Sequence, residues 1–394
     1  MSFIQDVLEH NKEFESPTSF WKWSAYCAIS AVLKDNVWLP DGDSKIFPNI
    51  YILFLAESGA RKGRPVDLCE RLVKEIGCTK TISGRSSIQG IMDELAHTET
   101  NKQGVMLKGG SAVWYAPELS SGIVADESAI AVLTDIYDGK TDFKSLLRHS
   151  PKFKVDRIVF TAFMASNEAM LKNFYNHTAA HGGLLARTFL VTEQGEFRPS
   201  NPLTKKIDKS ESYKNLVRQL RDIERLRGEF FFTEEAIEAY DPWYNNFRMS
   251  YRGRDKGGVA GRMHTGVKKL ACILAANTGE LTLRKVHVEE AIHECLILMP
   301  NYNSFIMSAG KSDIADAGTI LLLELQKAPG YTLDKRQVLR DHWQDFDIET
   351  LDRLAGTLEE AGFIKTVLAH PTLFYSLTPR AIEMLVKKST GAGT

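Results

Sequence analysis

Short, almost wholly apolar runs alternate with amphipathic segments between residues 48 and 195. Strands buried on both faces of a parallel sheet read as continuous hydrophobic runs, whereas helices repeat apolar residues every three or four positions. The alternation therefore predicts a doubly wound α/β domain built around a parallel sheet. The predicted strands are residues 50–55, 111–116, 158–165 and 186–191.

The parts of the chain that flank this domain are predicted to be helical. Residues 1–47 carry an aromatic-rich helical face that includes Trp21 and Trp23, and we expect this face to pack on a core. Residues 213–309 show the spacing of several amphipathic helices. The chain is therefore divided into a helical N-terminal segment, an α/β core, a helical lid and a small C-terminal unit, at residues 1–47, 48–212, 213–309 and 310–394.

The C-terminal segment has the pattern of a small, separate unit. Apolar residues at helical spacing predict helices at 313–326, 335–342 and 347–361. Two strand-like runs, 363–368 and 372–377, flank Ala-His-Pro and predict a hairpin. Three helices followed by a two-stranded wing resemble a winged-helix domain. Because its third helix is acidic, we expect a partner protein there rather than a DNA major groove, with the wing's Lys365 and His370 at most touching phosphates.

Composition limits the function classes without naming one. The 394 residues are 43% hydrophobic and 25% charged, which is typical of soluble proteins. The formal net charge is −1, so nucleic-acid binding would depend on local basic patches. Five cysteines without CxxC spacing indicate buried free thiols in a reducing compartment. The acidic N-terminal region and the lack of an apolar run of bilayer length favour a cytoplasmic protein without membrane contact.

The segment after the first predicted strand, residues 55–65, reads LAESGARKGRP. Aligning Lys62 with the lysine of the phosphate-loop pattern places Ala56 and Arg61 at its glycine positions and Gly63 at its Ser/Thr position. The pattern fails, but the context of a buried strand before and a helix after fits. The alternative is an ordinary strand-loop-helix with a solvated basic tip. The candidate nucleotide-binding residues are Ser58, Gly59, Ala60, Arg61, Lys62, Gly63 and Arg64.

Polar side chains follow two later predicted strands at the point where each strand ends. Pro117 and Glu118 follow the run 111–116, and Asn167 follows the run 158–165. Because such strand ends face the ligand crevice of open α/β sheets, Glu118 is a candidate for polarising an attacking water and Asn167 for orienting it. The alternatives are that Glu118 caps the next helix and that Asn167 belongs to a surface turn.

A single arginine precedes the last predicted strand of the core. The run HGGLLARTFLV places Arg187 before residues that carry no other charge. Such an arginine can pair with a neighbouring acid, or it can reach the phosphates of an adjacent subunit and neutralise transition-state charge. Spacing alone leaves both interpretations open.

The order of these features along the chain resembles the ATPase core of AAA+ hexameric helicases. They are the loop of Lys62, then Glu118 and Asn167 after strands, then Arg187 before a strand. The run LLARTFLV is similar to the arginine-finger segment of minichromosome-maintenance-type helicases, and residues 19–63 resemble the opening of helicase-like P-loop proteins of phages, prophages and mobile elements, some fused to primases. The resemblance covers roughly residues 15–310. It implies Lys62 at the β/γ-phosphates, Glu118 at the water, Asn167 as a sensor, Arg187 as a finger acting in trans, and Arg262 as a second sensor in the lid.

The sequence departs from this family at the positions that hold magnesium. Gly63 replaces the Ser/Thr ligand, and Pro117 replaces the acid that precedes Glu118. Magnesium is then expected to be held through water by Glu118 or by another carboxylate, with Asp126 and Asp135 as candidates. These departures weaken the expectation of hydrolysis.

The segment 138–157 is basic and rich in turns in an otherwise neutral chain. It precedes the strand of Asn167, where the helicases that it resembles carry a DNA-gripping hairpin. Such a segment suits a phosphate backbone without sequence readout, and a solvated basic loop is the alternative. Another basic turn, 251–256, is a weaker candidate because it also serves as a connection. The candidate nucleic-acid-binding residues are Lys140, Lys144, Arg148, Lys152 and Lys154.

The resemblance implies an ATP-dependent DNA translocase or helicase in the replication of a phage or mobile element. Its cofactors would be ATP and Mg²⁺, and its form would be a homo-oligomer, a hexameric ring with single-stranded DNA in the central pore. The alternative is a nucleotide-binding replication initiator or assembly scaffold with little or no hydrolysis. A small-molecule kinase is not supported, because the basic segment and the winged helix would have no role.

Overall fold

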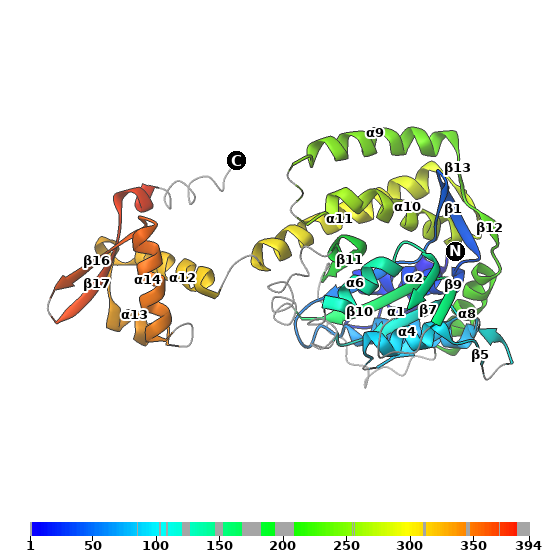
Figure 1. Cartoon of the computed structure of the whole chain (residues 1–394), viewed down its shortest axis with the longest axis horizontal. Coiled ribbons are helices and arrows are strands. Elements are labelled where there is room, and N and C mark those ends of the chain that lie inside the picture. Colours follow the sequence, from blue (N-terminus) through cyan, green and yellow to red (C-terminus); the bar gives the residue numbers. More distant parts are fainter. Residues whose placement is uncertain are drawn as a thin grey trace. The chain divides into compact units, whose positions relative to one another are not determined.

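The chain forms two compact units, residues 1–306 and 307–394, shown in the computed structural model of Figure 1. The expected start of the second unit was residue 310. The structure describes residues 2–84, 86–101, 104–107, 109–119, 127–145, 153–167, 183–193, 209–253, 255, 257–309, 313–343, 347–369 and 371–383.

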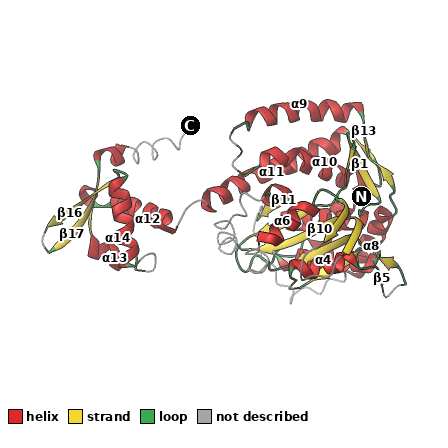
Figure 2. Cartoon of the chain, viewed as in Figure 1, coloured by secondary structure: helices red, strands yellow, loops and turns green. Residues whose placement is uncertain are grey.

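The centre of the first unit is a five-stranded parallel sheet (Figure 2). In spatial order its strands are β4 (Lys80–Ser83), β7 (Ser111–Ala116), β10 (Val159–Ser166), β3 (Tyr51–Leu55) and β11 (Thr188–Thr192). Every residue of β3 and β10 is buried, which explains why these strands read as continuous apolar runs. The predicted α/β fold with a central parallel sheet is confirmed.

The edge strand β4 was not predicted from the sequence. It is only four residues long and begins with Lys80, which is 2% exposed. The Lys80 ammonium donates to the carbonyl oxygens of Glu94, at 2.7 Å, and of His97. Burial lowers the pKa of Lys80, opposed by nearby glutamates. Because a lysine interrupts the apolar pattern even when its ammonium is hydrogen-bonded inside the protein, the sequence of β4 does not read as a buried strand.

Helix α2 (Thr18–Leu33) is the central helix packed on this sheet. It contacts β3, β10 and β11 and also α3 (Gly63–Ile76). The ring of Phe20 stacks on Phe54 with 4.2 Å between centroids, and Trp23 lies 4.8 Å from Phe189. The aromatic residues of the N-terminal segment therefore pack on the core, as expected. The preceding helix α1 (Phe3–Asn11) contacts α2.

The end of the N-terminal segment is a hairpin, so the expectation of helix throughout residues 1–47 is wrong there. Strands β1 (Val37–Asp41) and β2 (Ser44–Ile46) pair antiparallel, and β12 (Gly228–Glu229) adds to β1. Val37 and Leu39 are buried with a partly exposed residue between them, which is strand periodicity. Gly42 turns the chain with φ +59°, a conformation that favours glycine.

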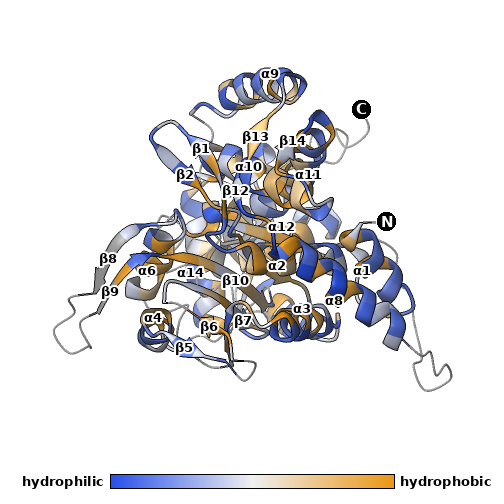
Figure 3. Cartoon of the chain, turned by 90° about the vertical axis from the view of Figure 1, so that its right-hand side faces the viewer, coloured by the Kyte–Doolittle hydropathy of each residue, from blue (hydrophilic) through white to orange (hydrophobic). Residues whose placement is uncertain are grey.

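The region after the sheet is mainly helical, as predicted. Its helices are α8 (Ser210–Glu224), α9 (Glu234–Ser250), α10 (Val259–Asn277) and α11 (Lys285–Ala309), with the short parallel strands β13 (Phe231–Phe232) and β14 (Thr282–Leu283). Figure 3 shows hydrophilic colour along α8 and hydrophobic colour along β10. Across the described part of the chain, no helix has both the length and the apolar character needed to span a bilayer.

Several smaller elements complete the first unit. Helix α4 contacts both β7 and β9. These elements are α4 (Ile88–Ala96), α6 (Glu127–Ile136), the antiparallel pairs β5 (Glu99–Thr100) with β6 (Met106–Leu107) and β8 (Thr141–Ser145) with β9 (Phe153–Arg157), and the 3-10 turn η2 (Leu185–Arg187).

The second unit contains the three helices and the hairpin that the sequence predicted. Leu321, Leu351 and Leu354 pack with Tyr375 in its core. An additional short strand, β15, joins the hairpin to give the order β15-β17-β16. The elements are α12 (Asp313–Lys327), the 3-10 turn η3 (Pro329–Tyr331), β15 (Thr332–Asp334), α13 (Lys335–Asp341), α14 (Ile348–Glu360), β16 (Ile364–Ala369) and β17 (Thr372–Leu377).

Candidate functional site

The loop between β3 and α3 has a backbone that favours glycine, although it contains only one glycine before Lys62. Gly59 has φ +99° and Arg61 has φ +54°. Arg61 stands where the phosphate-loop pattern has glycine, and a left-handed arginine costs free energy unless its surroundings hold it. Ser16 Oγ donates to the Arg61 carbonyl at 3.0 Å, and Arg61 Nε lies 3.0 Å from Glu15 Oε2. The α1–α2 connection therefore holds the loop.

The N-terminus of α3 is open to an anion. No side chain caps it, its first turn contains no acidic residue, and a Cβ added at Gly63 would meet nothing within 4 Å. The first N–H groups of a helix lack intrahelical partners and carry partial positive charge. Lys62 lies beside them, and its Nζ donates to the carbonyl oxygens of Ala56 at 2.6 Å and Glu57 at 2.8 Å. The loop thus gathers donors suited to a phosphate.

Three further side chains belong to the same edge of the sheet. Glu118 follows β7, Asn167 follows β10 and Glu193 follows β11, at the carboxyl ends of parallel strands around β3. The Leu119 amide donates to the Ala165 carbonyl at 2.8 Å, which fixes the chain next to Glu118. Burial lowers the pKa of Lys62, and the charges of Glu118 and Glu193 raise it. The two carboxylates therefore act on the Lys62 ammonium.

Glu193 was missed in the sequence. It follows the apolar run of β11 just as Glu118 follows that of β7, so the same signal was present. In the described part of the chain, no group of three or more His, Cys, Asp or Glu side chains is placed to hold a metal ion. A pair of carboxylates still fits Mg²⁺, which commonly keeps several waters and binds phosphates.

The two acids suggested earlier for magnesium do not join this edge. Asp126 lies outside the described residues. Asp135 lies on α6, where Lys140 donates to it at 2.5 Å. It is three residues from Asp138, which pairs with Arg187 at the opposite edge of the sheet. Glu193 is therefore the better candidate to accompany Glu118.

Arg187 and Arg262 lie at the other, amino edge of the sheet and share one carboxylate. Arg187 Nη2 lies 3.1 Å from Asp138 Oδ2, and Arg262 Nη1 lies 3.2 Å and 3.1 Å from the two oxygens of that group. Arg187 Nη1 also donates to the Gly183 carbonyl at 3.0 Å. The sequence could not pair these residues, because Asp138 lies far from both along the chain.

The two edges are too far apart for one chain to bring all these residues to one ligand. Arg187 directly precedes the five-residue strand β11, and Glu193 directly follows it. A strand of that length spans about 16 Å. The sheet therefore separates Lys62 from Arg187 and Arg262 within a subunit.

The basic segment before β10 contains an antiparallel ribbon. Strands β8 and β9 extend from the body of the unit (Figure 3), and the backbones of Lys144 and Lys154 lie opposite one another in the register. Lys140 precedes the ribbon. Arg148 and Lys152 lie outside the described residues, as do the side chains of Lys144 and Lys154. An antiparallel pair of strands therefore lies where the resemblance implies a hairpin, and a DNA-binding role for it stays a prediction.

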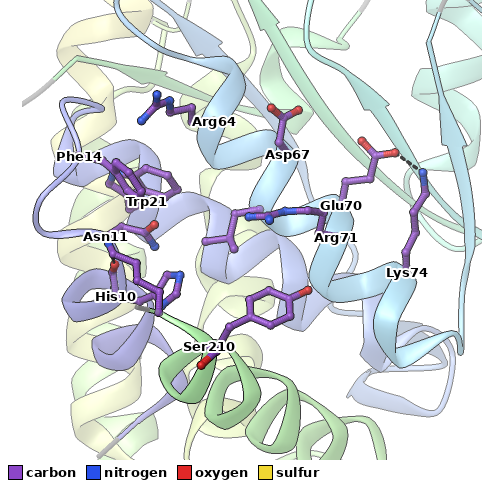
Figure 4. A pocket seen from close by; sticks show the side chains of 13 residues that line it. His10, Asn11, Phe14, Trp21, Arg64, Asp67, Glu70, Arg71, Lys74 and Ser210 are labelled. Atoms are coloured by element: carbon purple, nitrogen blue, oxygen red, sulfur yellow. Dashed lines mark hydrogen bonds and ion pairs between the residues drawn. The ribbon is translucent and has the colours of Figure 1, made fainter. Parts of the chain in front are cut away.

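A groove of about 920 Å³ runs along α3 from its N-terminus. Figure 4 shows Arg64 and Arg71 of α3 and the ring of Phe14 around the groove, and Tyr213 of α8 also lines it. The Phe14 ring has the Arg64 guanidinium 5.1 Å from its centroid and Lys209 Nζ 4.0 Å from it. Aromatic faces next to cations suit a planar base joined to a phosphate. Its walls come from three separate segments, so sequence reading did not find it.

A buried lysine lies beneath the amino edge. Lys269 of α10 is 2% exposed, and its Nζ donates to Asn49 Oδ1 at 2.8 Å, to the Asn49 carbonyl at 3.0 Å and to the Tyr137 carbonyl at 3.3 Å. Burial lowers the pKa of Lys269 to about 7, although the charge of Asp138 opposes the shift. The network joins α10 to the start of β3.

The free energy of unfolding is expected to rise from pH 7 to about 7.5, a range in which the cysteine thiols of the unfolded chain, whose ordinary pKa is about 8.5, remain mostly protonated. The folded-state pKa of Lys269 is about 7 and its ordinary value is 10.5. Above pH 7 the unfolded state therefore binds more protons, and stability increases with pH, by at most about 1.4 kcal/mol per pH unit. Denaturant unfolding measures the slope. Lys269→Met should reduce it, and an undiminished slope in that variant would contradict the shift.

The phosphate-type loop, two carboxylates and Asn167 meet at one edge of the sheet, and two arginines meet at the other. No protein-family model matches the chain, and no curated protein matches it.

Proposed function

We propose that the chain is an ATP-dependent DNA translocase or helicase of the AAA+ kind that acts in the replication of a phage or mobile element. The observation that carries the proposal is the β3–α3 loop. It places Lys62 at an uncapped helix N-terminus and keeps Arg61 in a left-handed conformation where the phosphate-loop pattern has glycine. An ordinary surface turn would not require a left-handed arginine that Glu15 and Ser16 of another segment hold in place.

In this proposal the carboxyl edge binds and activates ATP. Lys62 and the first N–H groups of α3 bind the β- and γ-phosphates, and Glu118 accepts a proton from the attacking water. Asn167 orients that water. Bound Mg²⁺, held by Glu118 and Glu193 through water, would neutralise phosphate charge. The groove along α3 receives the base and sugar, next to Arg64.

The amino edge supplies the second half of each site. Arg187 and Arg262 lie about one strand length from the edge of Lys62, so they serve the nucleotide of a neighbouring subunit. Such a head-to-tail interface closes into a ring when the rotation permits. A six-fold ring follows the resemblance to hexameric helicases.

Two features outside the site support a DNA motor. The β8–β9 ribbon directly precedes β10, so closure around ATP next to Asn167 would move it along a strand in the pore. Strand β10 lies between β3 and β7, so the ribbon leads into the strand that pairs with β3, the strand before the loop of Lys62. The C-terminal unit serves as a winged-helix domain that binds a replication partner.

A nucleotide-binding initiator or scaffold without turnover is the second candidate. Gly63 lacks the hydroxyl that would bind magnesium, and Pro117 lacks the carboxylate expected before Glu118. Both differences concern the metal and leave the phosphate-binding donors in place. Retained binding without hydrolysis would favour this candidate.

Lys62→Ala is expected to weaken ATP binding by at least about tenfold and to abolish turnover, because it removes the ammonium at the loop. Titration with a fluorescent ATP analogue and phosphate release, with and without single-stranded DNA, measure both. Lys285→Ala is the matched control, because Lys285 is exposed on α11, outside the loop and the groove, and pairs with Glu289 at 3.7 Å. Unchanged ATP binding by Lys62→Ala would refute the loop assignment.

A further inference from the structure

Asp138 binds two arginines that come from different parts of the chain. Arg187 precedes β11, Arg262 lies on α10, and their Nη atoms lie 3.1 Å from the same oxygen, Asp138 Oδ2. Asp138 directly follows buried Tyr137. At Gly139, φ is +72°, and an added Cβ would lie 2.6 Å from Phe47. The backbone on both sides of Asp138 is therefore held in place by packing, and its carboxylate bridges the two arginines.

The cluster has more positive than negative charge. Two guanidinium groups share one carboxylate, and the Lys269 ammonium lies close enough for both arginines and Asp138 to influence its pKa. The Arg187 side chain is only 10% exposed, and its Nε is buried without a hydrogen-bond partner in the described part of the chain. A doubly or triply charged anion would satisfy this arrangement better than one carboxylate does.

We propose that Arg187 and Arg262 form a phosphate-binding site that the chain's own Asp138 occupies in the isolated subunit. Asp138 acts as an internal competitor, because its oxygens bind the same Nη atoms that a phosphate would bind. The arginines then become available only when a phosphate group displaces the carboxylate. This rests on the proposed function in one respect, which is that the natural ligand is the terminal phosphate of ATP bound to the adjacent subunit.

Pyrophosphate binding to the full chain tests this competition directly. In a Lys62→Ala background, which removes the loop as a binding site, Asp138→Asn is expected to tighten pyrophosphate binding by about tenfold in low salt. Asp135→Asn is the matched control, since it removes the same charge three residues away, from a carboxylate that pairs with Lys140 and not with the two arginines. It should change the affinity less than about twofold. Isothermal titration calorimetry gives both dissociation constants.

Adding Arg187→Ala and Arg262→Ala to Asp138→Asn should remove the gain. Equal affinities of Asp138→Asn and its parent would overturn the proposal, as would a gain that persists without the two arginines. Asp138→Ser, checked by thermal melting, replaces Asp138→Asn if the latter fails to fold.

The readout separates this inference from the proposed function. If the unsubstituted chain shows no ATP turnover but Asp138→Asn still tightens pyrophosphate binding, the phosphate site is supported and the motor is refuted. Normal DNA-stimulated turnover with no effect of Asp138→Asn on pyrophosphate would support the motor and refute the competitor.

Discussion

Arg187→Ala is expected to lower ATP turnover by a factor of about 10³ or more, the effect of losing an arginine that stabilises transition-state charge. ATP binding should weaken far less than turnover, because Lys62 and the first N–H groups of α3 remain in place. Steady-state phosphate release and nucleotide titration measure the two quantities. Turnover that is insensitive to Arg187→Ala would contradict the shared site.

Mixing two inactive variants tests the sharing itself. In rings that contain both Lys62→Ala and Arg187→Ala subunits, some interfaces combine an intact Lys62 with an intact Arg187, so turnover should reappear. Lys62→Ala mixed with Glu118→Gln is the control. Both of these residues belong to the same carboxyl edge, so no interface in that mixture is complete. Restoration in the control, or none in the test mixture, would refute the arrangement.

Glu118→Gln is expected to lower turnover by about 10² to 10⁴, the usual contribution of a general base. ATP binding should persist, because the phosphate donors of Lys62 and α3 remain. Single-turnover phosphate release, measured beside the dissociation constant for ATP, separates the two effects.

Glu57→Gln is the matched control for Glu118→Gln. Glu57 is exposed in the same loop and offers Lys62 only its backbone carbonyl, which the substitution keeps. Loss of binding in Glu118→Gln would assign Glu118 to ligand binding instead of proton transfer. Undiminished turnover would move the proton acceptor elsewhere.

Local sequence was sufficient for most of the central sheet. Continuous apolar runs predicted β3, β7, β10 and β11 to within about two residues at each end, because strands buried on both faces leave no polar positions. The same reading failed for β4, whose Lys80 is buried on backbone carbonyls. It also failed for β1 and β2, which an adjoining aromatic helix obscured.

The C-terminal unit shows the same balance. Its helices and hairpin follow from helical spacing and from the Ala-His-Pro turn, and the structure contains them. The third strand, β15, pairs with β17 but spans only Thr332–Asp334. A three-residue strand carries too short a pattern to be recognised without its partner.

By itself, the sequence determined the parallel α/β core, placed Lys62 in the loop after β3 and placed Glu118 and Asn167 at strand ends, because these are local properties of strand and turn. Only the tertiary structure decided which residues share an edge. It brought Glu193 into the electrostatic surroundings of Lys62, and it joined Arg187 and Arg262 through Asp138. Asp138 lies 49 and 124 positions from these arginines, and no periodicity within one element encodes contacts across such separations.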